Sequence, residues 1–255
     1  IIVKPIAGAG SADTYRVNDR GELEAVLPLL RSVPEVSVEE FVEAEEFTFD
    51  TICAQGCIAF HNICWYRPRP LIAKSHEWVS PQTVILKDPD VPHLAAGRAM
   101  GVRVLEALGF EDGFTHMEWY LKENGEAVFG EIGARPPGGR TVDGMNYSGD
   151  FDLYAAWAEA VVHGAIRRPL ERRYNVVVLF KRATGQGRIA RIEGLESRLH
   201  RYGQHIVAYE LLPIGAPRRN WKATLISDGA VVVRQPDLEY TCEMSDAVAS
   251  DLRMY

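Results

Sequence analysis

The chain has 255 residues, of which 47% are apolar, 25% charged and 9% aromatic, a composition typical of a folded globular protein. The net charge of −7 disfavours a general attraction to nucleic acid or to an anionic membrane surface. No apolar run is long enough to cross a bilayer as a helix. We therefore expect no nucleic-acid or membrane partner, and any phosphate must be bound at a local site.

The four cysteines have spacings that match neither a zinc ribbon nor a small disulfide-bonded fold. They are Cys53, Cys57, Cys64 and Cys242. We expect reduced thiols and a cytoplasmic location. The first residues have the pattern of a buried strand without an initiator Met or signal peptide before it. We therefore expect the chain to begin inside a domain, with an N-terminal domain missing.

In chain order, a strand over residues 1–4 is followed by a loop with two glycines and a short strand over 14–17. Asp19 and Glu22 have the spacing of a capping box, which predicts a helix that ends near Leu30. Further strands, rich in Val, Phe and Thr, are predicted over 36–41, 46–54 and 57–66. These segments predict a mixed α/β domain that contains an antiparallel sheet.

The stretch 67–92 contains five prolines, which predicts a long loop or lid. Helices are expected from His93 to Gly109 and over 152–163, each closed by a glycine. The later segments are strands over 175–182 and 205–212, a hairpin of 222–227 with 230–234, and a helix from about Ser245. We divide the chain into a domain over 1–168 and a smaller, β-rich C-terminal lobe over 169–255.

A second hairpin is predicted where Asn124 and Gly125 join the strands 114–120 and 127–132. A two-residue loop would place Glu118 opposite Glu131, Trp119 opposite Gly130 and Leu121 opposite Val128. Alternation then assigns Met117, Trp119, Leu121, Val128 and Ile132 to the core face, and His116, Glu118, Tyr120, Phe129 and Glu131 to the other. One face of the hairpin therefore presents two carboxylates.

Two directly opposed carboxylates repel each other unless a cation compensates their charge. Mg²⁺ suits such a pair, because it binds one or two protein carboxylates and completes its shell with water and phosphate oxygens. The alternative is a salt bridge to a basic side chain such as Arg135. A glycosidase acid/base pair has no other support in the sequence.

The loop after Lys4 contains Gly8, Gly10 and Ser11, whose backbone N–H groups could hold phosphate oxygens while the lysine supplies positive charge. It is not a Walker A motif, because the lysine precedes the glycines. Glycines that only serve the geometry of a turn are the alternative interpretation.

Four motifs occur in order: Lys4-Pro with its Gly-Ser loop, the segment VEEFVEAEEFT over 38–48, His116-Met-Glu118, and EIGARPPGG over 131–139. Together they resemble the ATP-grasp superfamily, and within it the carboxylate-amine ligases that join amino acids; biotin carboxylase and D-alanine:D-alanine ligase are more distant. The match covers roughly residues 1–165. The resemblance implies an α/β (α+β) fold in which two subdomains, linked near 38–43, clasp ATP beside a β-rich lobe.

The resemblance also implies roles for individual residues. Lys4 and Arg135 would be catalytic, and Glu118 and Glu131 would bind Mg²⁺, or Mn²⁺ in its place. The nucleotide-binding residues would be Lys4, Gly8, Gly10, Ser11, Glu39, Glu40, Val42 and Glu46. Many relatives have a further metal ligand, Asn, where this chain has Gly133. His116 lies opposite Gly133 in the predicted register, where we expect it to hydrogen-bond a carboxylate.

The implied reaction uses ATP to convert a carboxylate, by resemblance that of an amino acid, into an acyl phosphate that an amine then attacks to form an amide. ADP and phosphate would be released, and a homodimer is compatible with the family. A carboxylase acting through carboxyphosphate is the enzymatic alternative. The alternative from another class is a nucleotide-binding module without catalysis.

Overall fold

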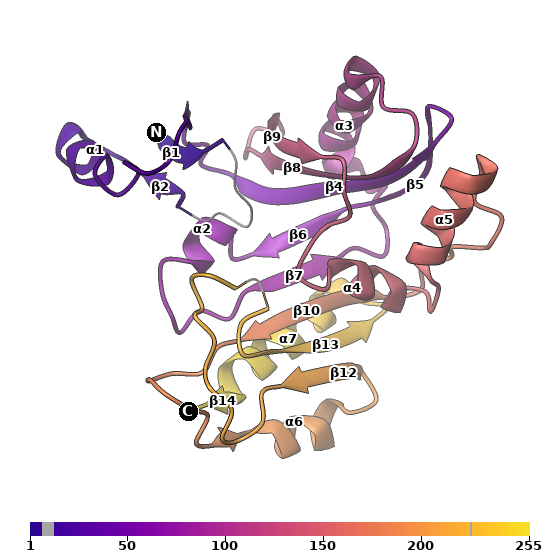
Figure 1. The fold of residues 1–255 in the computed structure, drawn as a ribbon. Coiled ribbons are helices and arrows are strands. Elements are labelled where there is room, and N and C mark those ends of the chain that lie inside the picture. The colour runs from indigo at the N-terminus through magenta and orange to yellow at the C-terminus, as the bar shows by residue number, and fades with distance from the viewer. Residues whose placement is uncertain (7–12, 225) are drawn as a thin grey trace.

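In a computed structural model, the chain is described over residues 1–6, 13–224 and 226–255. A small sheet of order β2-β1-β3 and helix α1 form an N-terminal unit beside a sheet of nine strands (Figure 1). The large sheet has the order β12-β13-β10-β7-β6-β4-β8-β9, with β5 also paired to β4. No helix of the described residues is long and apolar enough to cross a membrane.

The strands are β1 (Ile2–Pro5), β2 (Tyr15–Arg16), β3 (Val36–Glu39), β4 (Glu45–Ala54), β5 (Cys57–Asn62), β6 (Cys64–Arg67), β7 (Gln82–Ile85), β8 (Gly113–Leu121), β9 (Ala127–Gly133), β10 (Asn175–Lys181), β11 (Ile192–Glu193), β12 (Ile206–Leu211), β13 (Gly229–Gln235) and β14 (Arg253–Met254). The helices are α1 (Arg20–Val26), α2 (Pro70–Ala73), the 3₁₀ turn η1 (Pro92–Leu94), α3 (Ala95–Leu108), α4 (Thr141–Tyr147), α5 (Leu153–His163), α6 (Leu195–Tyr202) and α7 (Leu238–Asp251).

Both faces of the large sheet are covered by helices. Strand β10 is buried on both of its faces, because Val177 and Leu179 belong to one buried cluster while Val176 and Val178 belong to the other. Helices α3 and α7 contribute to the first cluster and α4 and α5 to the second. A continuous apolar strand is the pattern expected where both faces are buried.

Helix α1 is shorter than predicted. The Asp19 side chain accepts a hydrogen bond from the Glu22 backbone N–H at 2.9 Å, which confirms the N-cap. The Glu22 carboxylate accepts from the backbone N–H of Asn18 instead of that of Asp19. The helix ends at Val26, because Pro28 has no N–H to continue the hydrogen-bond pattern.

The loop predicted over 67–92 is wrong in part. It contains helix α2 and strand β7, and β7 is a fully buried strand between β6 and β10. A strand of four residues is too short to show the alternation of apolar and polar side chains that identifies a strand. The nearby Pro81 and Pro89, which lie outside β7, favoured the prediction of a loop. Helix α4 was also not predicted.

The predicted hairpin of 222–227 with 230–234 is wrong as well. Strand β13 pairs with β10 on one side and β12 on the other, and no strand lies in 222–224 or 226–227. The large sheet continues across residue 168, because β10 pairs with β7. The division of the chain into two domains at that residue stays a prediction.

The hairpin of β8 and β9 has the predicted carboxylate pair and a different loop. Glu118 lies directly opposite Glu131, as expected. The loop has three residues, because the Lys122 N–H donates to the Glu126 carbonyl, and a bulge at Gly130 then restores the register. Trp119 is therefore opposite Phe129, and Leu121 is opposite Ala127. Val128 lies opposite Tyr120 and shares its face of the hairpin, although it was predicted to lie on the core face.

Gly130 makes the bulge possible, because a Cβ added there would lie 2.7 Å from the backbone carbonyl oxygen of Glu118. We predict that Gly130→Ala lowers the free energy of unfolding by about 1–3 kcal/mol, since backbone atoms must move. Gly133→Ala, on the same strand, places its Cβ at an ordinary 3.4 Å from Arg135 and should change stability by less than about 1 kcal/mol. Denaturant unfolding of both variants measures the difference; equal stabilities would contradict it.

Candidate functional site

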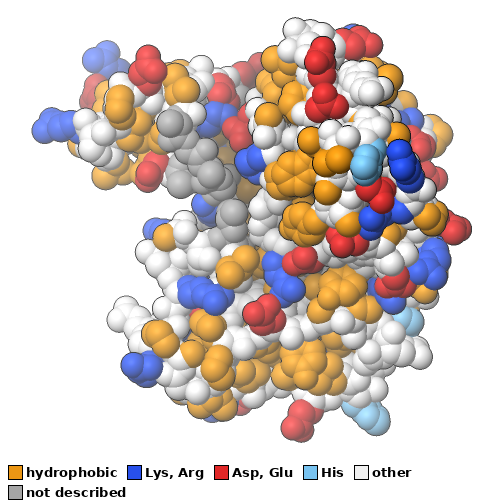
Figure 2. Space-filling view, turned by 45° about the vertical axis from the view of Figure 1, so that its right-hand side comes forward, with side chains coloured by type: hydrophobic (Ala, Val, Ile, Leu, Met, Phe, Trp, Pro, Cys, Tyr) orange, Lys and Arg blue, Asp and Glu red, His pale blue; other side chains and the backbone are white. Residues whose placement is uncertain are grey.

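A cavity of about 990 Å³ lies between the N-terminal unit and the large sheet, and we call it the central cavity. The surface is indented beside the N-terminal unit in Figure 2. Every predicted site residue within the described part of the chain lines this cavity: Lys4, Glu39, Glu40, Val42, Glu46, Glu118, Glu131 and Arg135. Gly8, Gly10 and Ser11 lie outside the described residues.

Lys4 connects the two sides of the cavity. It extends from β1, and its Nζ lies 3.0 Å from a Glu39 carboxylate oxygen on β3 and 3.5 Å from Glu131 on β9. Partial burial opposes its charge, but the two carboxylates outweigh burial and raise the pKa of Lys4. The residue predicted to bind phosphate is thus a fixed cation beside the predicted metal ligands.

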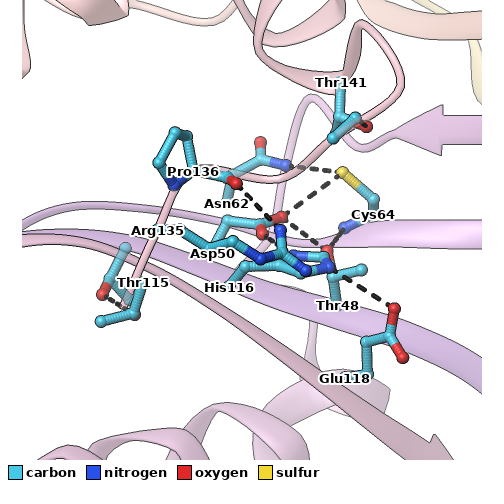
Figure 3. Close-up of polar contacts among 12 residues, drawn as sticks. Thr48, Asp50, Asn62, Cys64, Thr115, His116, Glu118, Arg135, Pro136 and Thr141 are labelled. Atoms are coloured by element: carbon cyan, nitrogen blue, oxygen red, sulfur yellow. Dashed lines mark hydrogen bonds and ion pairs between the residues drawn. The ribbon is translucent and has the colours of Figure 1, made fainter. Parts of the chain in front are cut away.

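Glu118 is held by a chain of buried polar groups (Figure 3). Its Oε1 lies 3.4 Å from His116 Nε2, and Nδ1 of the same ring lies 2.6 Å from the fully buried Asp50. Burial disfavours the imidazolium, but Asp50 and Glu118 raise the pKa of His116 to about 10. Burial likewise opposes ionisation of Glu118, yet His116, Arg135 and Lys4 lower its pKa. The expected role of His116, a hydrogen bond to a carboxylate, is confirmed.

Glu131 completes the carboxylate pair. Its side chain is 53% exposed, so it can meet a ligand in the cavity without breaking a buried contact. No cluster of three or more His, Cys, Asp or Glu suited to a metal occurs in the described part of the chain. Two carboxylates on facing strands nevertheless fit Mg²⁺, which takes few protein ligands when phosphates and water supply the others.

Glu46 has a partner that the sequence did not reveal. Arg69 Nε lies 3.3 Å from Glu46 Oε2, and the same guanidinium donates to the Val42 backbone carbonyl at 2.8 Å. The Arg69 guanidinium also lies over the rings of Phe41 and Tyr120. Burial, with repulsion from Glu118, raises the pKa of Glu46 to about 7 in spite of Arg69. Arg69 therefore connects the Glu46 carboxylate to the Val42 backbone, and both residues were predicted to bind the nucleotide.

Arg135 is exposed, and its guanidinium donates to the Pro136 carbonyl at 3.0 Å. The alternative of a salt bridge to Glu131 is not found among the described residues, where Lys4 is the partner of Glu131. The charge of Arg135 nevertheless contributes to the lowered pKa of Glu118. Arg135 is thus near the carboxylate pair and is held by no carboxylate of the described chain.

Sequence reasoning missed Asp50, Tyr66 and Arg69. A signal for Asp50 was present, because Glu46, Thr48 and Asp50 alternate with two phenylalanines and so share one face of β4. Tyr66, whose hydroxyl donates to Glu118 at 3.4 Å, and Arg69 come from segments whose position depends on the tertiary fold.

Glu46 gives a prediction for stability. Its pKa in the folded chain, about 7, lies above its ordinary value of 4.5, so between these values the folded state retains a proton that the unfolded state has lost. Stability should therefore fall as pH rises from about 4.5 to about 7, by about 3 kcal/mol at most. Glu46→Gln should remove this fall, and Glu45→Gln, which changes an exposed carboxyl on the same strand, should keep it. Urea unfolding across this pH range measures both; an unchanged pH profile in Glu46→Gln would contradict the assignment.

Comparison with known proteins gives one curated relative and many solved structures. No family model matches the chain. An L-arginine-specific L-amino acid ligase of Bacillus subtilis is 31% identical over 146 residues, which are 54% of this chain and 34% of that protein. The match thus spans about a third of the length of that relative.

Solved structures of low identity match over nearly all of this chain. An L-amino acid ligase from Bacillus licheniformis has a TM-score of 0.78 at 19% identity, and 100% of this chain covers 62% of it. An N5-carboxyaminoimidazole synthetase from Staphylococcus aureus, solved with ADP, has a TM-score of 0.69 at 15% identity, with 98% and 61% covered. A Hydrogenobacter thermophilus biotin carboxylase domain dimer with MgADP has a TM-score of 0.64 at 12% identity, with 100% and 57% covered. These matches confirm the α/β fold of the ATP-grasp type that was expected from the sequence.

Proposed function

From the ATP-grasp fold of this chain, we propose that it belongs to an ATP- and Mg²⁺-dependent ligase that joins a carboxylate to an amine. The observation that carries the proposal is the central cavity, where a lysine, a carboxylate pair on facing strands and an exposed arginine come together. The sequence identity of 31% over 146 residues to an L-arginine-specific L-amino acid ligase favours an amino acid as the carboxylate substrate.

In this proposal, the N-terminal unit and β4 hold the nucleotide. Val42 presents backbone groups to adenine, Glu46 accepts from the ribose hydroxyls, and Glu39 and Glu40 complete this end of the cavity. Lys4 contacts the phosphates, together with the loop that contains Gly8, Gly10 and Ser11. Mg²⁺ on Glu118 and Glu131, or Mn²⁺ in its place, would neutralise charge on the phosphoryl group.

The reaction then takes two steps. A carboxylate oxygen of the first substrate attacks the γ-phosphorus of ATP, the bond to the bridging oxygen breaks, and ADP leaves. The amine attacks the acyl carbon, the bond to phosphate breaks, and the nitrogen loses its proton to solvent. Arg135, which has two parallel donors, would hold the reacting carboxylate and the acyl phosphate.

The test incubates the chain with ATP and Mg²⁺ and measures ADP and product mass for pairs of amino acids. ADP formation that requires a pair, with a product lighter than the pair by one water, supports the ligase. ADP formation that requires bicarbonate instead supports a carboxylase. Nucleotide binding without ADP formation under any condition supports a binding module and contradicts the proposal.

Arg135→Lys separates a role on the reacting carboxylate from a role in nucleotide binding. Lysine retains the charge and loses the bidentate geometry, so we expect kcat to fall by on the order of 10² while Mg-ATP binding stays near that of the wild type. Glu131→Gln is the comparison, because loss of a metal ligand should weaken Mg-dependent ATP binding itself. Turnover and nucleotide titrations measure the two effects; normal turnover of Arg135→Lys would contradict the role.

A further inference from the structure

Glu118 is oriented by groups that lie outside the central cavity or at its wall. Building on the proposed function, we propose that His116, anchored by Asp50, is a positioning residue that presents only one oxygen of Glu118 to the metal. A carboxylate restricted in this way favours Mg²⁺ or Mn²⁺ over Ca²⁺. Figure 3 shows the contacts that join Asp50 to His116 and His116 to Glu118.

The His116 ring is held in place by the buried Asp50. Asp50 is 0% exposed; its Oδ1 accepts from His116 Nδ1 at 2.6 Å, and its Oδ2 accepts from the Thr48 hydroxyl at 2.6 Å. The Thr48 oxygen in turn accepts from the Cys64 backbone N–H at 3.2 Å. Because Asp50 is held on both oxygens within the sheet, the ring that it binds has little freedom to rotate.

His116 and Tyr66 both contact the same oxygen of Glu118. His116 Nε2 and the Tyr66 hydroxyl each lie 3.4 Å from Oε1. No hydrogen bond to Oε2 of Glu118 is found among residues 1–6, 13–224 and 226–255. Oε1 is thus engaged by the protein, and Oε2 is the oxygen that can meet a cation in the cavity.

Because only Oε2 of Glu118 is available to a cation, the site discriminates between Mg²⁺ and Ca²⁺. Mg²⁺ requires a near-octahedral shell at 2.0–2.1 Å, typically with single carboxylate oxygens, whereas Ca²⁺ takes six to eight oxygens and accepts both oxygens of one carboxylate. A Glu118 that cannot offer Oε1 suits the smaller ion. His116 is itself no ligand in this arrangement, because both ring nitrogens are occupied, although it lies opposite Gly133.

Two substitutions of His116 separate the roles of its two ring nitrogens. The amide of Asn reaches about as far as Nδ1, so His116→Asn keeps a group near Asp50 and loses the donor to Glu118. The amide of Gln reaches about as far as Nε2, so His116→Gln keeps a donor for Glu118. A matched control is Thr115→Val, which removes a buried hydroxyl contact of 2.6 Å to Thr51 on the same two strands and does not line the cavity.

The experiment measures the dissociation constant of ADP by calorimetry with Mg²⁺, Mn²⁺ or Ca²⁺, along with thermal unfolding. His116→Asn should weaken Mg²⁺-dependent binding by roughly 10- to 100-fold, and Ca²⁺-dependent binding clearly less. His116→Gln should keep most of the wild-type preference for Mg²⁺. Thr115→Val should keep the preference in full, whatever its loss of thermal stability.

The results distinguish a failure of the positioning role of His116 from a failure of the proposed metal site. If His116→Asn weakens binding equally with all three metals, or leaves it unchanged, the positioning role is wrong and the proposed ligase is unaffected. The same holds if His116→Gln loses the preference as fully as His116→Asn. If the wild-type chain binds ADP with none of the three metals, the metal site is wrong, and the positioning role and the Mg²⁺-dependent function fall together.

Discussion

The central constraint on this structure is the concentration of carboxylates on one face of the large sheet. Register places Thr48 opposite Glu118 and Glu118 opposite Glu131, while Glu46 and Asp50 lie two residues to either side of Thr48 on the same face of β4. Such a face would be unstable without compensation, because neighbouring like charges on a sheet repel. Each carboxylate accordingly has a cationic partner.

The partners come from three different parts of the chain. Lys4 from the N-terminal unit reaches Glu131, Arg69 from the segment before α2 reaches Glu46, and His116 from β8 itself bridges two acids. The contacts of Lys4 and Arg69 therefore do two things at once: they neutralise the carboxylates and they fix the walls of the cavity. A site with this design is stable before a ligand arrives and is rich in groups that can exchange partners when one binds.

The sequence predicted the parts of the site that local rules control. The Asn124-Gly125 turn and strand alternation were enough to place Glu118 opposite Glu131, even though a three-residue loop and the bulge at Gly130 were missed. These two errors shift the register in opposite directions, so they cancel at the carboxylate pair and leave only the positions between them misassigned. The bulge has no local signal beyond a glycine, because its cause is the close approach of the Glu118 carbonyl.

Other features depend on contacts between distant segments. Strand β7 is short and flanked by prolines, and only its neighbours β6 and β10 make it a strand. Arg69 lies within the segment 67–92 that was expected to be a loop, and its role comes from the fold that carries it to Glu46 and Val42. Asp50 is different, because it was missed although alternation along β4 puts it on the same face as Thr48 and Glu46. What local pattern could not supply was the partner that makes a buried acid stable, and that partner is His116, on the adjacent strand.

The shared position of Lys4 links the two ligands that the proposed function requires. Lys4 neutralises Glu39 and Glu131, so a phosphate group that attracts Lys4 leaves Glu131 short of positive charge, and a metal ion on Glu131 supplies it. Conversely, a metal ion on Glu131 releases Lys4 to contact phosphate. Each ligand thus lowers the electrostatic cost of the other, and such coupling is reciprocal by thermodynamic necessity. In the proposed ligase, nucleotide and metal would therefore bind more tightly together than either does alone.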